Sequence, residues 1–324
     1  MPAITYEDNS YALGEGESVL DCLAREGHDI PSSCRSGVCH SCMLRATSGE
    51  LPPAAQKGLK DAHRAQGYFL SCCCHPEGDL TVTRADDATQ KVAARVLRKE
   101  TLNDRVLRVV LETDKPLEYF PGQFVNFARP GGLVRSFSLA SVPALGNELE
   151  FHVALVLGGS MSGWLHHEAA PGDPLELLGP LGNCFYVSGN PEQPLFMLGT
   201  GTGLAPLYGI LRDALNQGHR GPIHLFHGAL LASDLYLTES LRDLDGKHEN
   251  FTYHASVRDE PGEDWMEQGA VDTLALKTAP DLKGWKVFLC GNPDLVKQVQ
   301  RKTFMAGANM KDIHADAFLP AGGG

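Results

Sequence analysis

Residues 34–42 read CRSGVCHSC and place three cysteines in the spacing C-x4-C-x2-C. Arg, Ser, Gly, Val and His separate these cysteines, so the stretch offers no apolar run that would bury three thiols as ordinary core. Thiolates gathered this closely in one loop are typical of metal ligands. The stretch therefore predicts a metal site, and its fourth ligand must come from another part of the chain.

The run Cys72, Cys73, Cys74 supplies the candidates for that ligand. C-x4-C-x2-C with a distant fourth cysteine is the spacing of plant-type [2Fe–2S] centres, whose two irons take four thiolates. Zinc sites more often use two C-x2-C pairs, and covalent haem needs a histidine after C-x-x-C, where this chain has methionine. The spacing therefore predicts a [2Fe–2S] cluster, with Gly37 free to turn backbone N–H groups toward the sulfurs.

These residues resemble the plant-type ferredoxin domain. That family often leaves 29 residues between its third and fourth ligands and sets the fourth in L-x-C-x-x-x-P. This chain has 29 residues, 43–71, in that interval, and LSCCCHP at 70–76. His40 departs from the small residue usual at its position and is expected on the surface of the loop. The resemblance implies four cluster ligands: Cys34, Cys39, Cys42 and Cys72.

The composition limits the possible class of protein. A chain of 324 residues with 43% hydrophobic residues suits two or three domains that each bury a core. Its net charge of −12 disfavours nucleic acid as a partner. The first residues lack the basic start and apolar run of a signal peptide, and no apolar stretch is long enough to span a membrane. We therefore expect a cytoplasmic protein, in which the nine cysteines stay reduced.

Residues 1–88 fit a small β-grasp domain around the cysteines. ITYEDNSYAL predicts a hairpin, SVLDCLAREG a helix and GDLTVTRA a closing strand. The charged residues 84–87 are expected to link this domain to the next.

Residues 91–188 read as short alternating strands separated by Pro and Gly, which predicts a closed antiparallel six-stranded barrel. RSFS, residues 135–138, sets a cation, an aromatic ring and hydroxyls on successive strand positions. GGSMS, residues 158–162, opens a predicted helix, whose N-terminal N–H groups favour a pyrophosphate. Taken alone, each motif is more often plain strand or turn.

Together and in this order, the two motifs resemble the flavin domain of the ferredoxin–NADP+ reductase superfamily. The resemblance implies that Arg135 binds a flavin phosphate, that Phe137 lies against the isoalloxazine and that the Ser138 hydroxyl meets flavin N5. FAD is expected, because relatives with the ferredoxin domain first generally use it. The implied flavin site comprises Arg135, Ser136, Phe137, Ser138, the backbone of His152, Val153 and Ala154, and the turn Gly159, Ser160, Met161 and Ser162.

Residues 191–324 alternate buried strands with helical stretches such as 233–244 and 293–304, which predicts a parallel-sheet α/β domain with ligands at the strand carboxyl ends. The glycines of GTGTGLAP, residues 199–206, let backbone approach a pyrophosphate. This stretch and CGNP, residues 290–293, resemble the nicotinamide domain of the same superfamily. The implied nicotinamide site comprises Gly199, Thr200, Gly201, Thr202, Gly203, Ala205, Pro206, Cys290 and Gly291.

The resemblance also implies catalytic positions. Cys290 would lie beside the nicotinamide, although a thiol that merely ends a buried strand stays open. Phe318 would cover the flavin as the terminal aromatic residue, and Ser138 would act at N5. Residues 229–231 are Ala-Leu-Leu where a 2′-phosphate site would carry a cation, which favours NADH, although Arg258 leaves NADPH open.

The three-part order resembles the reductase components of bacterial multicomponent oxygenases. The implied activity is an NADH:acceptor reductase that takes two electrons as a hydride and passes them singly, through FAD and the [2Fe–2S] cluster, to a partner. That partner is expected to be a terminal oxygenase, Rieske-type or di-iron, or another one-electron acceptor protein. Two alternatives stay open: a reductase of this architecture that serves a deoxysugar dehydratase, and a redox-sensing or binding module without turnover.

Overall fold

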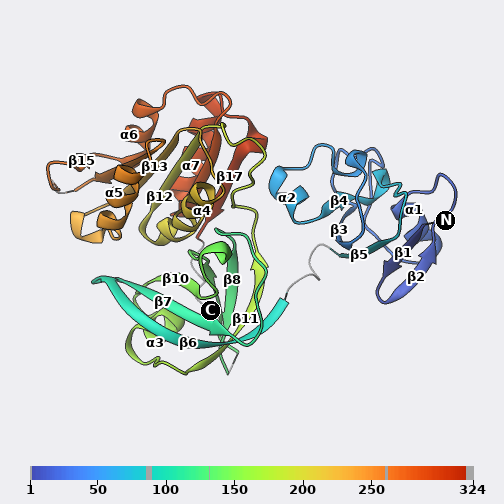
Figure 1. Cartoon of the computed structure of the whole chain (residues 1–324), viewed down its shortest axis with the longest axis horizontal. Coiled ribbons are helices and arrows are strands. Elements are labelled where there is room, and N and C mark those ends of the chain that lie inside the picture. The colour runs from blue at the N-terminus through green and yellow to red at the C-terminus, as the bar shows by residue number, and fades with distance from the viewer. Residues whose placement is uncertain (1, 85–89, 131, 260–261, 319–324) are drawn as a thin grey trace. The chain divides into compact units, whose positions relative to one another are not determined.

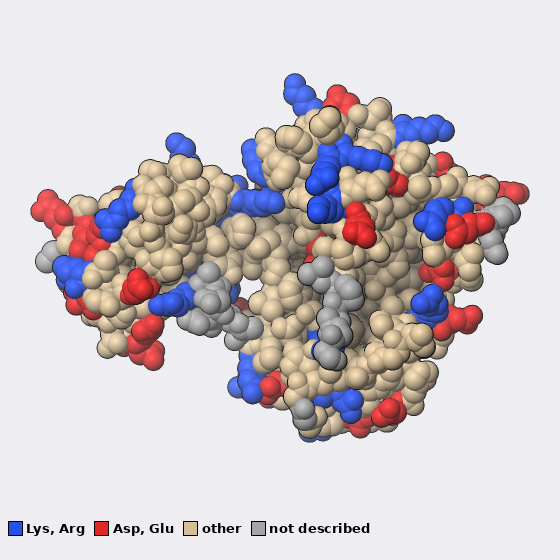
Figure 2. Space-filling model, turned by 180° about the vertical axis from the view of Figure 1, so that it is seen from behind, with Lys and Arg blue, Asp and Glu red and all other residues tan. Residues whose placement is uncertain are grey.

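The computed structural model describes residues 2–84, 90–130, 132–259 and 262–318. The chain forms two compact units, residues 1–89 and 90–324 (Figure 1). Of the stretch expected to link them, Arg84 ends the last strand of the first unit, and residues 85–87 lie outside the described residues. Acidic and basic side chains both occur on each unit in the face drawn in Figure 2.

The first unit is a five-stranded sheet in the order β2-β1-β5-β3-β4. β1 pairs antiparallel with β2 and parallel with β5, and β3 pairs antiparallel with β5 and β4. Glu7 and Asp8 both take positive φ in the β1–β2 turn, as a tight hairpin requires. These strands span Ala3–Tyr6 (β1), Asn9–Ala12 (β2), Met43–Ser48 (β3), Tyr68–Leu70 (β4) and Leu80–Arg84 (β5).

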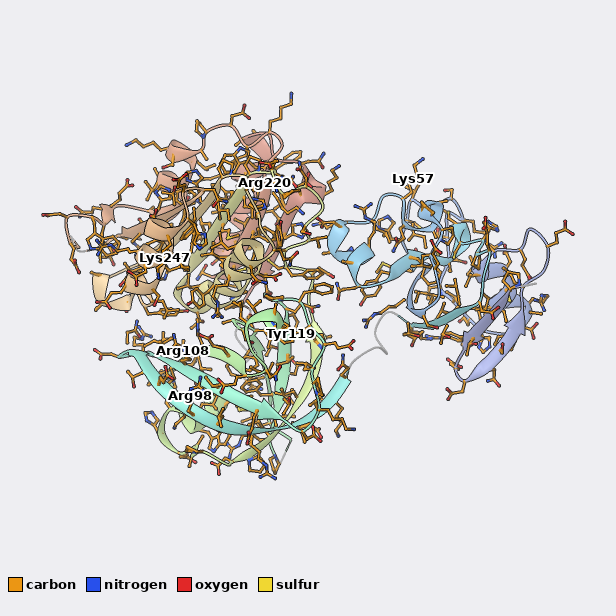
Figure 3. The ribbon with its side chains drawn as sticks, viewed as in Figure 1. Lys57, Arg98, Arg108, Tyr119, Arg220 and Lys247 are labelled. Atoms are coloured by element: carbon orange, nitrogen blue, oxygen red, sulfur yellow. The ribbon has the colours of Figure 1, made fainter. Side chains whose placement is uncertain are left out.

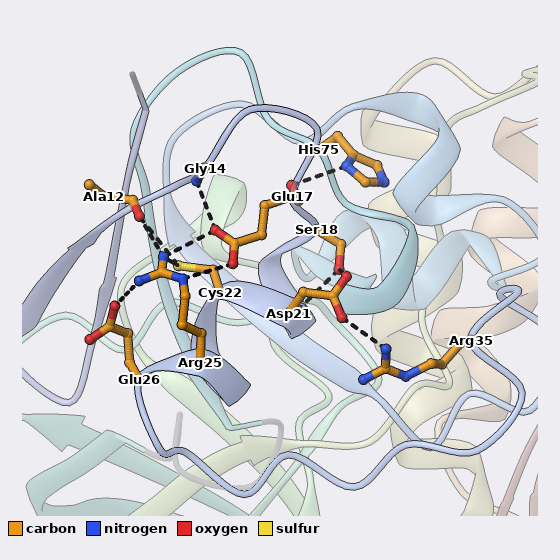
Figure 4. Close-up of polar contacts among 10 residues, drawn as sticks. All are labelled: Ala12, Gly14, Glu17, Ser18, Asp21, Cys22, Arg25, Glu26, Arg35 and His75. Atoms are coloured by element: carbon orange, nitrogen blue, oxygen red, sulfur yellow. Dashed lines mark hydrogen bonds and ion pairs between the residues drawn. The ribbon is translucent and has the colours of Figure 1, made fainter.

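Helix α1 (Val19–Arg25) begins where the Ser18 hydroxyl accepts the Asp21 N–H at 3.1 Å. Its buried face, which includes Cys22, packs into the core of the sheet. Asp21 also accepts the Arg35 guanidinium at 2.9 Å and so ties the cysteine loop to the helix (Figure 4). Short helical turns complete the unit: Pro53–Gln56 (η1), Asp61–Ala65 (α2) and Ser71–Cys73 (η2).

The second unit begins with the predicted antiparallel barrel, six strands in the order β10-β7-β6-β11-β8-β9. The bridge from Leu139, just after β9, to Phe151 of β10 joins the two ends of the sheet. The helix predicted at the Gly-rich turn is present as α3 (Ser160–His167). The strands span Gln90–Asn103 (β6), Val106–Thr113 (β7), Phe124–Ala128 (β8), Val134–Ser138 (β9), Leu149–Ala154 (β10) and Pro174–Leu181 (β11).

The remainder of this unit is the predicted parallel sheet, in the order β15-β14-β13-β12-β16-β17. The strands span Leu195–Thr200 (β12), Ile223–Ala229 (β13), Phe251–Val257 (β14), Glu267–Gln268 (β15), Lys286–Gly291 (β16) and Ile313–Ala317 (β17). The helices span Leu204–Asn216 (α4), Thr238–Lys247 (α5), Val271–Thr278 (α6) and Pro293–Met305 (α7). The predicted fold class is therefore confirmed for all three parts.

One predicted helix starts later than its sequence pattern indicates. Residues 233–244 were expected to be helical throughout, but α5 begins only at Thr238, after Leu237 in the left-handed region at φ 57°. The preceding Leu235 and Tyr236 are buried in the core instead. Tertiary packing of these two side chains therefore overrides the local helical periodicity.

Candidate cofactor sites

The cysteine loop supplies a first pair of thiols, Cys34 and Cys39. The Cys34 sulfur accepts the backbone N–H groups of Val38 and Cys39, both at 3.3 Å, and that of Ser36 at 3.5 Å. The hydroxyl and N–H group of Ser36, together with the N–H group of Cys39, lower the pKa of Cys34 to about 5. The Ser41 hydroxyl donates to the Cys39 sulfur at 3.2 Å and lowers the pKa of that thiol. Both sulfurs are thus prepared to be thiolates.

Cys42 and Cys72 form a second pair where β3 and β4 meet. The register Met43↔Leu70 brings the residue before β3 next to the turn after β4. Cys42 and Cys72 thus lie near enough that each affects the pKa of the other. Burial raises the pKa of both thiols. Cys74 faces the core, where burial raises its pKa to about 12.

This arrangement fits a two-iron cluster. No group of three or more His, Cys, Asp or Glu among the described residues could hold one metal ion. Two separate thiol pairs are what a [2Fe–2S] cluster requires, because each iron takes two protein thiolates and two bridging sulfides. Such a cluster, when bound, accepts and releases one electron. The chain holds its site near the surface, since Cys34 and Cys39 are exposed.

The RSFS strand β9 lies beside β8 in the barrel wall. Phe137 is half-buried, with its ring centroid 4.6 Å from that of Phe127, and Ser138 is only 8% exposed. The Ser136 hydroxyl donates to Asn126 Oδ1 at 2.6 Å, which fixes the strand. Arg135 is exposed and bonds within the described residues only to a backbone carbonyl, so its guanidinium is available to an anion.

The Gly-rich turn before α3 is closely packed and leaves the helix N-terminus free for a ligand. A Cβ at Gly159 would lie 2.5 Å from Ser162 Oγ and 2.9 Å from Val156 Cβ, so only glycine fits there. The Ser162 hydroxyl accepts the Val156 N–H at 3.2 Å and donates to the Gly159 carbonyl at 3.3 Å. In the part of the chain that the structure describes, no side chain caps α3, so its first N–H groups can meet a phosphate.

The turn from β12 into α4 is similarly restricted to glycine. A Cβ at Gly203 would lie 2.3 Å from the Cys290 carbonyl oxygen, and one at Gly291 would lie 2.7 Å from the Thr200 carbonyl oxygen. The carboxyl ends of β12 and β16 therefore touch backbone to backbone. Gly201 has a φ of 54°, and apart from its chain neighbours no atom of the described residues lies within 4 Å of its Cβ position. A pyrophosphate can approach the backbone at such a turn.

The predicted residue Phe318 lies beside Gly291 at the end of β16, one residue after the predicted Cys290. The Phe318 N–H donates to the Gly291 carbonyl at 2.8 Å. The Cys290 thiol is buried, 3.7 Å from the Cys184 thiol, and burial raises its pKa well above the usual value. The sequence did not reveal Cys184 as a partner, because it lies in the segment that follows β11.

A buried polar network on β10 joins the barrel to the parallel sheet, and the sequence did not reveal it. Glu150 accepts Arg108 at 3.0 Å, Arg212 of α4 at 3.0 Å and His152 Nε2 at 3.1 Å. A carboxylate only accepts, so the neutral His152 ring accepts the Tyr236 hydroxyl at Nδ1, 3.2 Å away. The side chain of His152 is therefore used within the protein, and only its backbone is available to the flavin. Figure 3 shows Arg108 on the barrel.

A cavity of about 390 Å³ lies at the carboxyl end of β13. Asp104 and Arg105 of the β6–β7 turn form one side of this cavity. The Asn103 amide next to them donates to the Asp234 carbonyl at 3.0 Å and so holds the turn near the segment that follows β13. Arg258, which follows β14, is exposed and pairs with Asp259 at 2.8 Å. Three carboxylates and one arginine are among the lining residues, which are Asp104, Arg105, Leu230, Leu231, Ser233, Asp234 and Asp259.

The fold and these sites define a nicotinamide-dependent flavoprotein that also carries an iron–sulfur cluster. Residues 5–77 match the 2Fe-2S iron-sulfur cluster binding domain, residues 93–186 the oxidoreductase FAD-binding domain and residues 197–301 the oxidoreductase NAD-binding domain. The chain therefore contains domains for a [2Fe–2S] cluster, FAD and NAD(H).

Relatives along the whole chain define the family. The reductase subunit of an aromatic O-demethylase from Amycolatopsis is 33% identical over 94% of this chain and 95% of its own length. The reductase component of naphthalene 1,2-dioxygenase/salicylate 5-hydroxylase systems from Ralstonia is 31% identical over 95% of both chains. The crystal structure of an Amycolatopsis cytochrome P450 reductase superposes with a TM-score of 0.70 at 31% identity, covering 99% of both chains.

The chain belongs to the family of reductase components that serve oxygenase systems, and it is an NAD(P)H-dependent flavin oxidoreductase. In the part of the chain that the structure describes, no helix is long and apolar enough to cross a membrane.

Proposed function

We propose that this chain takes hydride from NADH and delivers electrons singly, through FAD and its [2Fe–2S] cluster, to an oxygenase component. The observation that carries the proposal is the presence in one chain of a nicotinamide turn and two thiol pairs. A nicotinamide gives up two electrons at once, whereas a cluster passes on one. The cofactors supply this redox chemistry, and the protein's contribution is to bind and orient them.

The roles follow the three parts of the chain, which we assign as residues 1–88, 91–188 and 191–324. Cys34, Cys39, Cys42 and Cys72 would bind the cluster. Arg135 and the N-terminus of α3 would hold the flavin phosphates, the half-buried ring of Phe137 would lie against the isoalloxazine, and the Ser138 hydroxyl would donate to flavin N5. Two further groups would place the nicotinamide against the flavin: the turn 199–206, and the end of β16 with Cys290 and Phe318.

The cavity at the end of β13 favours NADH over NADPH. Ribose hydroxyls can donate hydrogen bonds to carboxylates, and Asp104, Asp234 and Asp259 line this cavity. A 2′-phosphate would meet the same three negative charges. Arg105 and Arg258 are the nearby cations, and Asp259 already pairs with Arg258. We therefore propose that the carboxylates select the unphosphorylated cofactor.

The relatives support an oxygenase as the acceptor, since the reported proteins are named as reductases of an aromatic O-demethylase, of a dioxygenase/hydroxylase system and of a cytochrome P450. We propose a metal-containing oxygenase that takes its electrons one at a time from the cluster. Affinity capture of the tagged holoprotein from its source cells would identify it. Capture of a sugar dehydratase instead would move the chain to the alternative function.

Replacing one cluster ligand distinguishes two steps of electron transfer, the reduction of the flavin by NADH and the passage of electrons through the cluster to an acceptor. We expect Cys72→Ser to lose the visible absorbance of the cluster and the reduction of cytochrome c by NADH. FAD, which lies in the second unit, should still be reduced by NADH in a stopped-flow experiment. The matched control is Cys22→Ala, which removes a buried thiol of the same unit that belongs to neither pair. A wild-type protein that binds FAD and cluster but reduces no acceptor with NADH would contradict the proposal.

A further inference from the structure

One thiol beside the cluster site has no part in the function proposed above. Of the three successive cysteines, Cys72 belongs to the second thiol pair and Cys74 is fully buried in the core. Cys73 is half-buried, and its sulfur lies 3.6 Å from that of Cys72, within hydrogen-bond distance for two sulfurs. The 3-10 turn Ser71–Cys73 brings the two neighbouring side chains this close.

The cysteine loop lies against this thiol from the other side. Gly37 has a φ of 75°, and a Cβ at this residue would lie 3.1 Å from the Cys73 sulfur. The absence of a side chain at Gly37 therefore leaves room for the Cys73 sulfur beside that of Cys72.

We propose that Cys73 is a positioning and tuning residue for the cluster, whose S–H donates a hydrogen bond to the Cys72 sulfur and raises the reduction potential. The inference rests on the proposed function, in which Cys72 is a ligand. A metal-bound thiolate has no proton to donate, so the direction of the bond is fixed from Cys73 to Cys72. Reduction adds negative charge to the cluster, and donors to its sulfurs stabilise that charge.

Two substitutions at Cys73 test the role of the donor. Cys73→Ala removes the S–H, and we expect the holoprotein to keep its iron, sulfide and FAD while its cluster potential falls in a spectroelectrochemical titration. At a fixed potential the ratio of reduced to oxidised cluster should change by roughly two- to tenfold, the range of one net hydrogen bond. Cys73→Ser replaces the thiol with a hydroxyl donor, so its potential should stay at or above the wild-type value.

The matched control is Cys74→Ala, because this thiol leaves the same turn toward the core. Its potential should equal that of the wild type. An intact cluster with an unchanged potential in Cys73→Ala would overturn the tuning role and leave Cys72 as the ligand. Equal falls in the Ala and Ser variants would show a packing effect instead of a donor, and would also overturn it.

A third result would count against the proposed ligand set itself. If Cys73→Ala loses its iron while Cys72→Ala keeps it, Cys73 is the ligand and the assignment of Cys72 is wrong. Iron content and the EPR signal of the reduced protein give this answer without any measurement of turnover. Failure of the tuning role and failure of the ligand assignment are therefore distinguishable.

Discussion

Gly203 illustrates at the scale of single residues how tightly the nicotinamide turn is packed. Any Cβ there meets backbone atoms on β16, the Cys290 carbonyl oxygen at 2.3 Å and the Gly291 Cα at 2.8 Å. Neither atom belongs to a flexible side chain that could move aside. The close approach of β12 and β16 at this turn, over which a cofactor would bind, therefore requires glycine at position 203.

We expect Gly203→Ala to push the ends of β12 and β16 apart and to raise the KM for NADH at least tenfold, because about 1.4 kcal/mol of lost binding gives that factor. Steady-state kinetics with an acceptor measures it. Gly246→Ala in α5 is the control, since among the described residues no atom outside its chain neighbours and its own helix backbone lies within 4 Å of that Cβ position, and alanine favours a helix. An unchanged KM in Gly203→Ala would contradict the close approach.

A second prediction at the scale of single residues concerns the role of the Ser138 hydroxyl in flavin reduction. Its side chain is largely buried in the barrel wall, at the end of β9. If it meets flavin N5, Ser138→Ala should slow flavin reduction by NADH roughly tenfold or more, with little loss of bound FAD. Stopped-flow absorbance gives the rate, and the exposed Ser240→Ala serves as the control. Equal rates for the two variants would remove Ser138 from the mechanism.

At the scale of elements, β10 connects the two halves of the second unit. Burial alone would raise the pKa of Glu150, but the hydrogen bond from His152 and the charges of Arg212 and Arg108 lower it to about 2. The carboxylate is 14% exposed and accepts three donors. It therefore neutralises guanidinium groups that come from different elements.

We expect Glu150→Gln to destabilise the second unit by about 1–3 kcal/mol, because Arg212 loses its counter-charge and Arg108 keeps only that of Glu100. Urea unfolding of the holoprotein, followed by flavin release, measures this loss. Glu148→Gln is the matched control, since its carboxylate is half-exposed and pairs with Arg98 at the surface, where an ion pair contributes less than about 1 kcal/mol. Equal losses in both variants would refute a special role for the network.

The sequence predicted elements and motifs better than contacts between segments. The cysteine spacing, the glycine turns and the strand alternation are local signals, and Cys34 and Cys39, which that spacing groups, lie close together in the structure. Glu150, Arg212 and Tyr236 lie in separate segments, so no spacing could relate them before the fold was known. The late start of α5 has the same origin, because Tyr236 is fixed by His152 and not by helical propensity.

At the scale of the whole molecule, buried histidines make the stability of the fold depend on pH. Burial lowers the pKa of His227 to about 3 and that of His254 to about 4. In the unfolded chain both would titrate near 6.5, so below that pH the unfolded state binds more protons. Their stabilising contribution is therefore present above about pH 6.5 and is lost as the pH falls toward 4.

The carboxyl group of Asp316 has the opposite effect on stability over part of this pH range, because its contribution grows as the pH falls. Burial raises its pKa to about 6, so its contribution is present at low pH and is lost as the pH rises from about 4 to 6. Two histidines outweigh one carboxyl, and His152, His219 and His224, whose pKa values burial also lowers, act in the same sense as the two histidines. We expect the urea midpoint of flavin release to fall on acidification from about pH 7, and less so in His254→Gln. A midpoint that rises would contradict this balance.

The pairing of β3 with β4 has a consequence for how the iron centre is assembled. Met43 lies opposite Leu70, which sets Cys42 beside the first of three chemically identical side chains. A slip of a single position along this ladder would present a different member of the run to the iron. Alignment of two short strands, and not the reactivity of sulfur, thus selects the proposed fourth ligand.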